Sequence, residues 1–167
     1  MSQIKDKVKW CLKKAMKELA ESKKHRGLIR INPSKVLARE HIFKAEHYLE
    51  ATFFLKEKFS DISASTVFYS IYHCFLAILA KYGYESRNQE CTFAVIYALA
   101  EAKEIDIDKS IIDKISLFSI KDDEDSVIEI REKYQYGVEL SMKEELYNEN
   151  VEIAKKILGK TKEIIEK

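Results

Sequence analysis

Hydrophobic residues recur at helical spacing through most of the chain. Over residues 3–24 they predict a helix with one apolar stripe, made by Ile4, Val8, Cys11, Leu12, Ala15, Met16 and Leu19. The pattern breaks at Gly27, in the stretch HRGLIRINP. A second helix is expected to begin at Pro33, with Asn32 as its N-cap, and to run to about Lys58.

The third predicted helix runs from Asp61, its expected N-cap, to about Gly83, which suits the left-handed position after a helix. On a helical wheel, a broad apolar side is formed by Phe68, Ile71, Phe75, Ile78 and Leu79. The opposite strip holds mostly small residues and one histidine: Ile62, Thr66, Ser70, His73, Ala77 and Ala80, with Tyr69 beside them. We therefore expect a central helix whose narrow strip meets another element or a second copy of the chain.

Further helical patterns cover about residues 89–103, the stretch IIDKISLF and the stretch SVIEIREKYQ, which ends near Gly137. Asp106 or Asp108 is expected to cap the short helix through IIDKISLF, and KDDED reads as an acidic turn. Ser141 and Glu144 have the spacing of a capping box before a last helix that Gly159 weakens. With only four Gly and one Pro, the chain is predicted to be all-α, an antiparallel helical bundle.

The charge of the chain is unevenly distributed. Residues 1–30 hold ten Lys or Arg and three acids, a net charge of +7, whereas the whole chain carries +1, so the remainder carries −6. A basic helix of this kind contacts nucleic acid or an acidic partner, or is simply a solvated face. Arginine and aromatic residues do not alternate in this segment, so the sequence gives no sign of base stacking there.

The cysteines and histidines do not have the spacing of a metal site. Cys11, Cys74 and Cys91 are far apart, and we expect three buried free thiols in a reducing compartment. His41 and His47 are six positions apart and do not share a helix face well, so no metal or cofactor is expected. No apolar run approaches the length of a membrane span and the start is too charged for a signal peptide, which predicts a cytoplasmic protein without a membrane partner.

His73 is the most informative titratable residue in the sequence. An imidazole where two helices or two chains meet can act as a general acid or base, or can be a hydrogen-bonded core residue. Ser63, Ser65 and Ser70 lie near it in the sequence, but no nucleophile-elbow motif surrounds them. Both interpretations of His73 stay open at this point.

Three segments together resemble one protein family. SASTVFYSIYHCFLAILAKYG is similar to the core helix of HEPN domains (higher eukaryotes and prokaryotes nucleotide-binding). AREHIFKAEHYLEATFFL resembles the first core helix of that family, and REKYQYG with VEIAKKILGKTKEIIEK resembles its Arg-x-x-x-x-Tyr-Gly segment and closing helix. The resemblance covers about residues 30–167, so we expect a basic N-terminal helical extension over 1–30 and a HEPN-like domain over 31–167.

The resemblance implies a bundle of four to five core helices that forms a homodimer. Many HEPN domains are metal-independent endoribonucleases whose motif is an Arg, four to six residues, then a His, and others bind RNA or nucleotides. Small single-domain members pair with a minimal nucleotidyltransferase as a toxin–antitoxin couple. The chemistry fits the motif, because RNA cleavage by its own 2′-OH needs proton transfer and a cation for the phosphorane charge.

This sequence departs from the family at the arginine. His73 aligns with the family histidine, but the motif arginine falls at Thr66, which has no charge and no bidentate fork. The resemblance therefore implies a dimeric nucleotide- or RNA-binding or toxin–antitoxin-type component with a degenerate ribonuclease motif. The alternative is an active metal-independent endoribonuclease that uses His73 with a displaced Arg87 or Arg131.

The candidate site residues follow from this comparison. His73 is the catalytic candidate, and the binding candidates are Thr66, Tyr69, Ser70, Arg87, Asn88, Arg131 and Tyr134. Simpler roles are also open for the residues outside the third helix. Asn88 can be the N-cap of the fourth helix, Arg131 can pair with a neighbouring acid, and Tyr136 can be a packing anchor beside Gly137.

Overall fold

The computed structural model describes residues 3–116 and 125–167. Within these residues it contains seven helices and one two-stranded antiparallel sheet. The elements in chain order are α1 (Gln3–Ser22), β1 (Leu28–Arg30), α2 (Lys35–Leu55), α3 (Ser60–Lys81), β2 (Tyr84–Ser86), α4 (Gln89–Glu101), α5 (Lys109–Ile115), α6 (Val127–Tyr136) and α7 (Glu144–Glu166).

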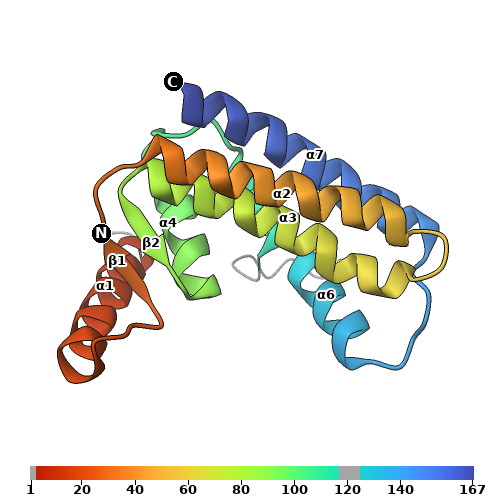
Figure 1. The fold of residues 1–167 in the computed structure, drawn as a ribbon, viewed down its shortest axis with the longest axis horizontal. Helices are drawn as coiled ribbons and strands as arrows, with labels where there is room; N and C mark the ends of the chain where they lie inside the picture. The colour runs from red at the N-terminus through yellow and green to blue at the C-terminus, as the bar shows by residue number, and fades with distance from the viewer. Residues whose placement is uncertain (1–2, 117–124) are drawn as a thin grey trace.

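The central element of the fold is α3. It packs against α2, α7, α6 and α4, and the short connection between α2 and α3 makes these two helices antiparallel (Figure 1). Helix α7 returns along α2 and α3, whereas α1 and the small sheet lie at one end of the molecule. The prediction of an all-α, antiparallel helical bundle is confirmed.

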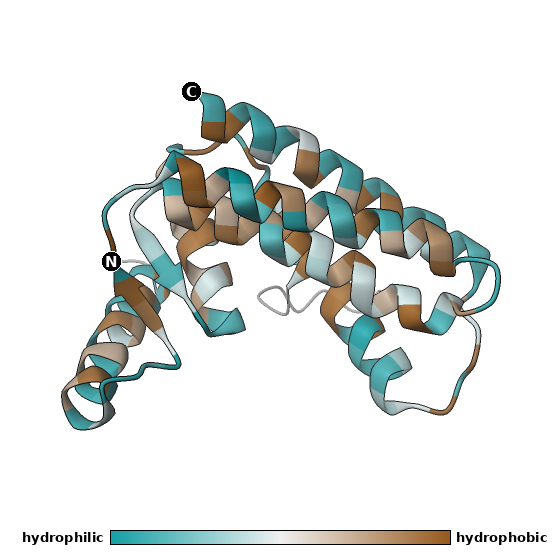
Figure 2. Ribbon diagram, in the orientation of Figure 1, coloured by the Kyte–Doolittle hydropathy of each residue, from teal (hydrophilic) through white to brown (hydrophobic). Residues whose placement is uncertain are grey.

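Both sides of α3 are covered by other elements, as its sequence pattern predicts. The broad side supplies fully buried residues to the main core, among them Phe68, Ile71, Phe75 and Ile78. The narrow strip packs on α2. Its Ala77 and Ala80 form a second, smaller cluster with Ala38, Ile42 and Ile165. Figure 2 shows that α1 and α7, by contrast, carry both hydrophilic and hydrophobic residues along their length, as expected of helices with one buried face.

The apolar length of α3 corrects one expectation. This helix of 22 residues is long and apolar enough to cross a membrane, whereas no such run was predicted. However, 61% of its apolar window is buried inside the protein. The central helix of a bundle passes the same test, because it is covered by other helices on several sides.

Three of the predicted helix starts are wrong. Helix α2 is capped by Ser34, whose side chain accepts from the backbone N–H of Leu37, and not by Asn32. Residues 31–34 form no helix, and Ser34 is extended, because the N–H groups of Ile31 and Ser34 donate to carbonyls at the end of α3. Tertiary hydrogen bonds have therefore moved the start of α2 past Pro33.

The other two wrong starts are those of α3 and α7. Phe59 occupies the N-cap of α3 in place of Asp61, and it makes no side-chain cap bond. Lys143 occupies the N-cap of α7, again without a side-chain cap bond, where Ser141 was expected to form a capping box with Glu144. A capping box is present at α6 instead, between Ser126 and Glu129.

Several other helix ends agree with the sequence pattern, but α2 ends at Leu55 rather than near Lys58, and residues 117–118 of the predicted short helix lie outside the described residues. Asn88 caps α4, Asp108 caps α5, and Gly83 follows α3 with a φ of 77°. Helix α7 continues through Gly159. Residues 121–124 of the predicted acidic turn lie outside the described residues.

The two short strands are not predicted by the sequence. β1 and β2 pair in antiparallel register, with Ile29 opposite Glu85, although 56 positions separate these residues. Gly27 and Gly83 lie beside this ribbon: the Gly27 carbonyl accepts from the N–H of Arg87, and the Gly83 carbonyl accepts from that of Ile31. The predicted boundary at residue 30 therefore falls inside a tertiary pairing.

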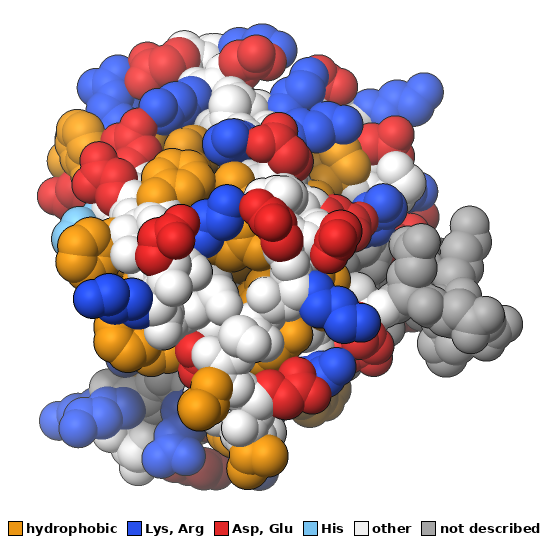
Figure 3. Space-filling view, turned by 90° about the vertical axis from the view of Figure 1, so that its right-hand side faces the viewer, with side chains coloured by type: hydrophobic (Ala, Val, Ile, Leu, Met, Phe, Trp, Pro, Cys, Tyr) orange, Lys and Arg blue, Asp and Glu red, His pale blue; other side chains and the backbone are white. Residues whose placement is uncertain are grey.

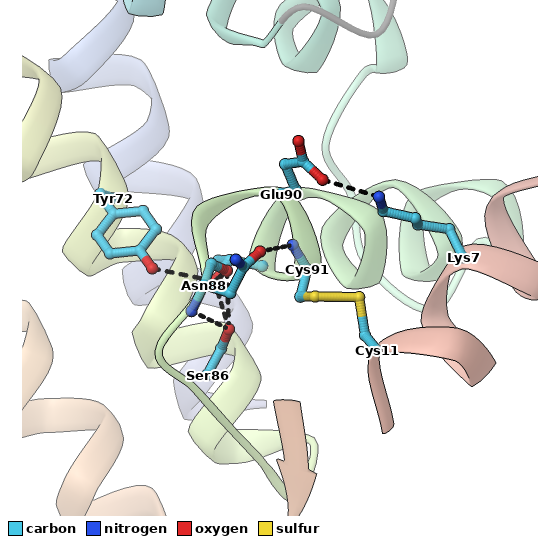
Figure 4. Close-up of a disulfide and its surroundings, with 8 residues drawn as sticks. Lys7, Cys11, Tyr72, Ser86, Asn88, Glu90 and Cys91 are labelled. Carbon is cyan, nitrogen blue, oxygen red and sulfur yellow. Dashed lines mark hydrogen bonds and ion pairs between the residues drawn. A yellow bond between two sulfur atoms is a disulfide. The ribbon is translucent and has the colours of Figure 1, made fainter. Parts of the chain in front are cut away.

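The cysteine prediction is wrong for two of the three thiols. Cys11 of α1 and Cys91 of α4 form a disulfide across a separation of 80 residues, as Figure 4 shows, and only Cys74 is a buried free thiol. In the same region Lys7 of α1 makes an ion pair of 2.7 Å with Glu90 of α4. The basic N-terminal helix is thus joined covalently to the bundle, and the cysteine argument for a reducing compartment no longer holds.

Candidate functional site

A row of polar contacts joins the narrow strip of α3 to α2, and we call this row the α2–α3 seam. Thr66 bonds through its hydroxyl to Thr52 at 2.7 Å, and Ser70 donates to the Ala45 carbonyl at 2.9 Å. One turn further along α3, His73 meets His41. The hydroxyls of Thr66 and Ser70 are satisfied within the seam, so the chemistry available to a ligand belongs to the histidines.

The two imidazoles of His41 and His73 are hydrogen-bonded to each other. Their Nδ1 atoms are 3.0 Å apart, and both side chains are half-buried. Tyr48 stacks on His73 with ring centres 5.5 Å apart, and the ammonium group of Lys44 lies 5.1 Å from the Tyr48 ring centre. Helix α2 therefore supplies a second imidazole, an aromatic ring and a cation beside the predicted catalytic residue.

Both histidines favour the neutral form. Burial lowers the pKa of His73 to about 4, with smaller contributions from His41 and from the positive charge of Lys44. Burial also lowers the pKa of His41, against an opposing effect of Glu40. At pH 7 the pair is uncharged, and Lys44 is the neighbouring cation.

The hydrogen bond between the two rings decides what each ring presents to a ligand. One histidine must carry its proton on Nδ1, which leaves its Nε2 as an acceptor. The other accepts at Nδ1 and must carry its proton on Nε2, which makes that atom a donor. Among the residues that the structure describes, no hydrogen bond to either Nε2 is found, so the pair offers one donor and one acceptor.

A row of aromatic rings leads from the histidine pair to Arg131. Tyr48 packs on Tyr69 with ring centres 5.5 Å apart, Tyr69 packs on Phe68 at 5.4 Å, and the Arg131 guanidinium lies 4.5 Å from the Phe68 ring centre. Arg131 is only 9% exposed, and its Nε has no hydrogen-bond partner. Three rings thus separate this arginine from His73, and its ion-pair contact is with Glu132.

The remaining candidates lie on other elements. Arg87 follows β2 and its Nε donates to Glu85 at 3.1 Å, while Asn88 uses its side chain to cap α4. Tyr134 is buried on α6. The structure therefore brings together Thr66, Tyr69, Ser70 and His73 on one helix, whereas Arg87 bonds to Gly27 and Glu85 and Asn88 bonds to the start of α4.

Sequence reasoning missed His41, Lys44 and Tyr48 as members of this site. They are spaced by three and four positions and so share one side of α2. That spacing was visible in the sequence, but nothing in it showed that this side of α2 faces His73. The signal that could have pointed there is a histidine on each of two consecutive helices.

The residues of the seam do not form a metal centre. In the described ranges, no group of three or more His, Cys, Asp or Glu side chains is placed to hold a metal ion. Imidazole, phenol and ammonium groups of this kind bind instead by hydrogen bonding, stacking and charge.

The sequence matches no protein-family profile and no curated protein. The HEPN resemblance is therefore a prediction from the motifs themselves.

Proposed function

We propose that the chain is a HEPN-like, dimeric component of the toxin–antitoxin type that binds RNA or nucleotides at the α2–α3 seam. In this proposal the histidine pair hydrogen-bonds a ribose hydroxyl and a phosphate oxygen, and Lys44 neutralises the phosphate. The observation that carries it is the 3.0 Å contact between His41 and His73, because it fixes one donor and one acceptor next to a cation.

The lowered pKa values favour binding over catalysis. A general acid in RNA cleavage must be protonated when it acts, and a histidine with a pKa of about 4 is almost wholly neutral at pH 7. Thr66 supplies no charge, and Arg131 is separated from the pair by three rings. The proposed component therefore cuts RNA weakly or not at all at neutral pH.

Exposed apolar side chains at the α2–α3 connection support the dimer. Phe54 is 85% exposed, and Phe59 and Ile62 are about half exposed at 50% and 48%. Figure 3 shows hydrophobic side chains on this end of the molecule among basic and acidic side chains. A second copy that covers this end would bury apolar surface.

The partner and location are proposed on narrower grounds. Pairing with a minimal nucleotidyltransferase is supported by the HEPN resemblance, and co-purification with such an enzyme tests it. A cytoplasmic location stays a prediction, and the Cys11–Cys91 disulfide counts against it, because disulfides are rare in cytosolic proteins.

A second candidate function is metal-independent RNA cleavage. It is favoured by the same donor and acceptor, since an Nε2 acceptor can take the proton of a 2′-OH. In this version His41 and Lys44 replace the missing arginine, rather than Arg87 or Arg131. Cleavage would then increase on acidification toward the low pKa of the pair, as one imidazole becomes a usable acid.

Binding of uridine 3′-phosphate in EDTA tests the proposed function. We expect His41→Gln, His73→Gln and Lys44→Gln each to weaken binding about tenfold or more, the usual effect of losing a hydrogen bond to a charged group. His47→Gln is the matched control, because His47 is exposed on the same helix. Unchanged affinity in all three seam variants would overturn the proposal.

A parallel assay separates the two candidate functions. Wild type and His73→Gln are incubated with a single-stranded RNA in EDTA at pH 7 and at pH 5. Cleavage that increases at pH 5 and is lost in His73→Gln establishes the ribonuclease, whereas binding without cleavage at either pH establishes the binding component.

A further inference from the structure

The exposed side of α1 carries an aromatic ring that the sequence pattern did not single out. This ring is that of Trp10, the only tryptophan in the chain, and its residue is 51% exposed. The ammonium groups of Lys7 and Lys14 lie 4.9 Å and 5.0 Å from its ring centre. An exposed indole close to two cations is a surface on which a base can stack while its phosphates meet positive charge.

More lysines follow on the same side of the helix. Three lysines lie three, four and seven positions after Trp10, namely Lys13, Lys14 and Lys17, and all four residues are exposed. We call them the Trp10 face. Lys17 makes a long, exposed contact of 3.8 Å with Glu21, which is worth little, and neither Lys13 nor Lys14 makes an ion pair within the described ranges.

The backbone under this face is held in place. Cys11, the next residue, is fully buried and bonded to Cys91 of α4, and α1 also packs on β1. Figure 4 shows the disulfide and the Lys7–Glu90 pair joining α1 to α4. The ring and its lysines are therefore presented on a fixed helix, so less entropy is lost when a ligand binds.

The arrangement fits a single-stranded nucleic acid better than a membrane surface. A membrane-bound helix inserts a continuous apolar face, but the apolar stripe of α1 packs against the core through Val8, Cys11, Leu12 and Ala15. On the exposed side, Trp10 and Met16 are about 120° apart at 100° per residue, so they form no stripe. An exposed aromatic ring together with cations is the combination on which proteins stack single-stranded bases.

We propose that the Trp10 face binds single-stranded RNA, with a base stacked on the indole ring and phosphates held by Lys13, Lys14 and Lys17. This site is separate from the α2–α3 seam, because the two share no residue. The seam takes a ribonucleotide, and the Trp10 face takes the strand without reading its sequence.

Fluorescence anisotropy with a labelled oligo(U) strand of about 15 nucleotides, in EDTA, tests the proposal. Trp10→Ala should weaken binding by about 5- to 150-fold, the range for losing one base–aromatic stack. Met16→Ala, an exposed apolar change on the same helix, should leave the affinity unchanged. Equal affinity of wild type and Trp10→Ala would overturn the proposal.

The lysines are tested by the salt dependence of the same binding. The double variant Lys13→Gln, Lys14→Gln should reduce the slope of log affinity against log salt by about 1.4, because each lost phosphate contact contributes about 0.7 for a single strand. The matched control is Lys155→Gln, Lys156→Gln, which removes the same charge from exposed positions on α7. Equal slopes in the two double variants would contradict the proposal.

Two further outcomes distinguish this site from its rivals. If the double variant His41→Gln, His73→Gln loses oligo(U) while Trp10→Ala keeps it, the strand binds at the seam and the Trp10 proposal is wrong. If Trp10→Ala loses binding to phosphatidylserine vesicles but not to oligo(U), the face binds an anionic membrane surface and the proposal is again wrong.

Discussion

Reduction of the Cys11–Cys91 disulfide should destabilise the protein strongly. The bond closes a loop of 80 positions, and in the chain-entropy treatment a loop of this length removes about 4.5 kcal/mol of conformational entropy from the unfolded chain at 25 °C. A domain of this kind has a total stability of about 5–15 kcal/mol. The disulfide therefore contributes a large share of the free energy of unfolding.

The assay is urea unfolding followed by far-UV circular dichroism, with and without dithiothreitol. With a urea m-value of about 2 kcal/mol/M, a loss of 4.5 kcal/mol lowers the midpoint by about 2 M. Thiol titration of the unfolded chain provides the chemical check. It should find one thiol, that of Cys74, before reduction and all three after it.

The control is the double variant Cys11→Ala, Cys91→Ala, whose midpoint should not respond to dithiothreitol. The reasoning is refuted if thiol titration finds the disulfide in the wild type and yet its midpoint is the same with and without the reductant. Three titratable thiols before reduction would refute the disulfide itself.

Three further predictions concern the histidine pair and two glycines. Because burial lowers the pKa of His73 to about 4 and also lowers that of His41, the unfolded chain binds more protons between about pH 4 and pH 6.5. The urea midpoint should fall as the pH is lowered through that window and should fall less in His73→Gln; a pH-independent wild type contradicts this. Gly83→Ala should cost about 1–2 kcal/mol or more, because φ is 77° and the new Cβ would lie 2.9 Å from the Ile31 carbonyl oxygen. Gly159→Ala should raise the free energy of unfolding by about 0.5–1 kcal/mol, and with it the melting temperature, because the position is helical and open; a lower melting temperature contradicts this.

Local signals in the sequence predicted the bundle and several of its helix ends. The apolar pattern of 60–81 identified the central helix and its two faces, and Gly83, Asn88 and Asp108 marked ends that depend on the nearest few residues. Such signals succeed because a cap or a left-handed turn is settled within one helical turn.

Features that depend on distant contacts could not be predicted. The β1–β2 pairing and the disulfide join segments 56 and 80 positions apart, and strands of three residues have no readable alternation. Ser34 replaced Asn32 as a cap because hydrogen bonds from Ile31 and Ser34 to the end of α3 keep residues 31–34 out of the helix. In each case the chain's tertiary contacts outweighed its local preference.

The candidate site shows the same division. His73 could be selected from its place on the narrow strip of α3, which the structure confirms as packed on another helix. Its partner His41 lies 32 positions away on α2, and no spacing rule connects the two. The donor and acceptor pair that supports the proposed function therefore becomes visible only when the two helices are placed side by side.

The proposed binding site at the α2–α3 seam is tested most directly by an NMR titration of the histidine ring nitrogens, in the presence and absence of uridine 3′-phosphate. In the free protein we expect His73 to titrate with a pKa of about 4 and His41 below its ordinary value. Adding the nucleotide at pH 7 should move the Nε2 signals of both histidines and leave those of His47 in place. Ordinary titration of both histidines, with no response to the nucleotide, would contradict the claim that the α2–α3 seam is the binding site.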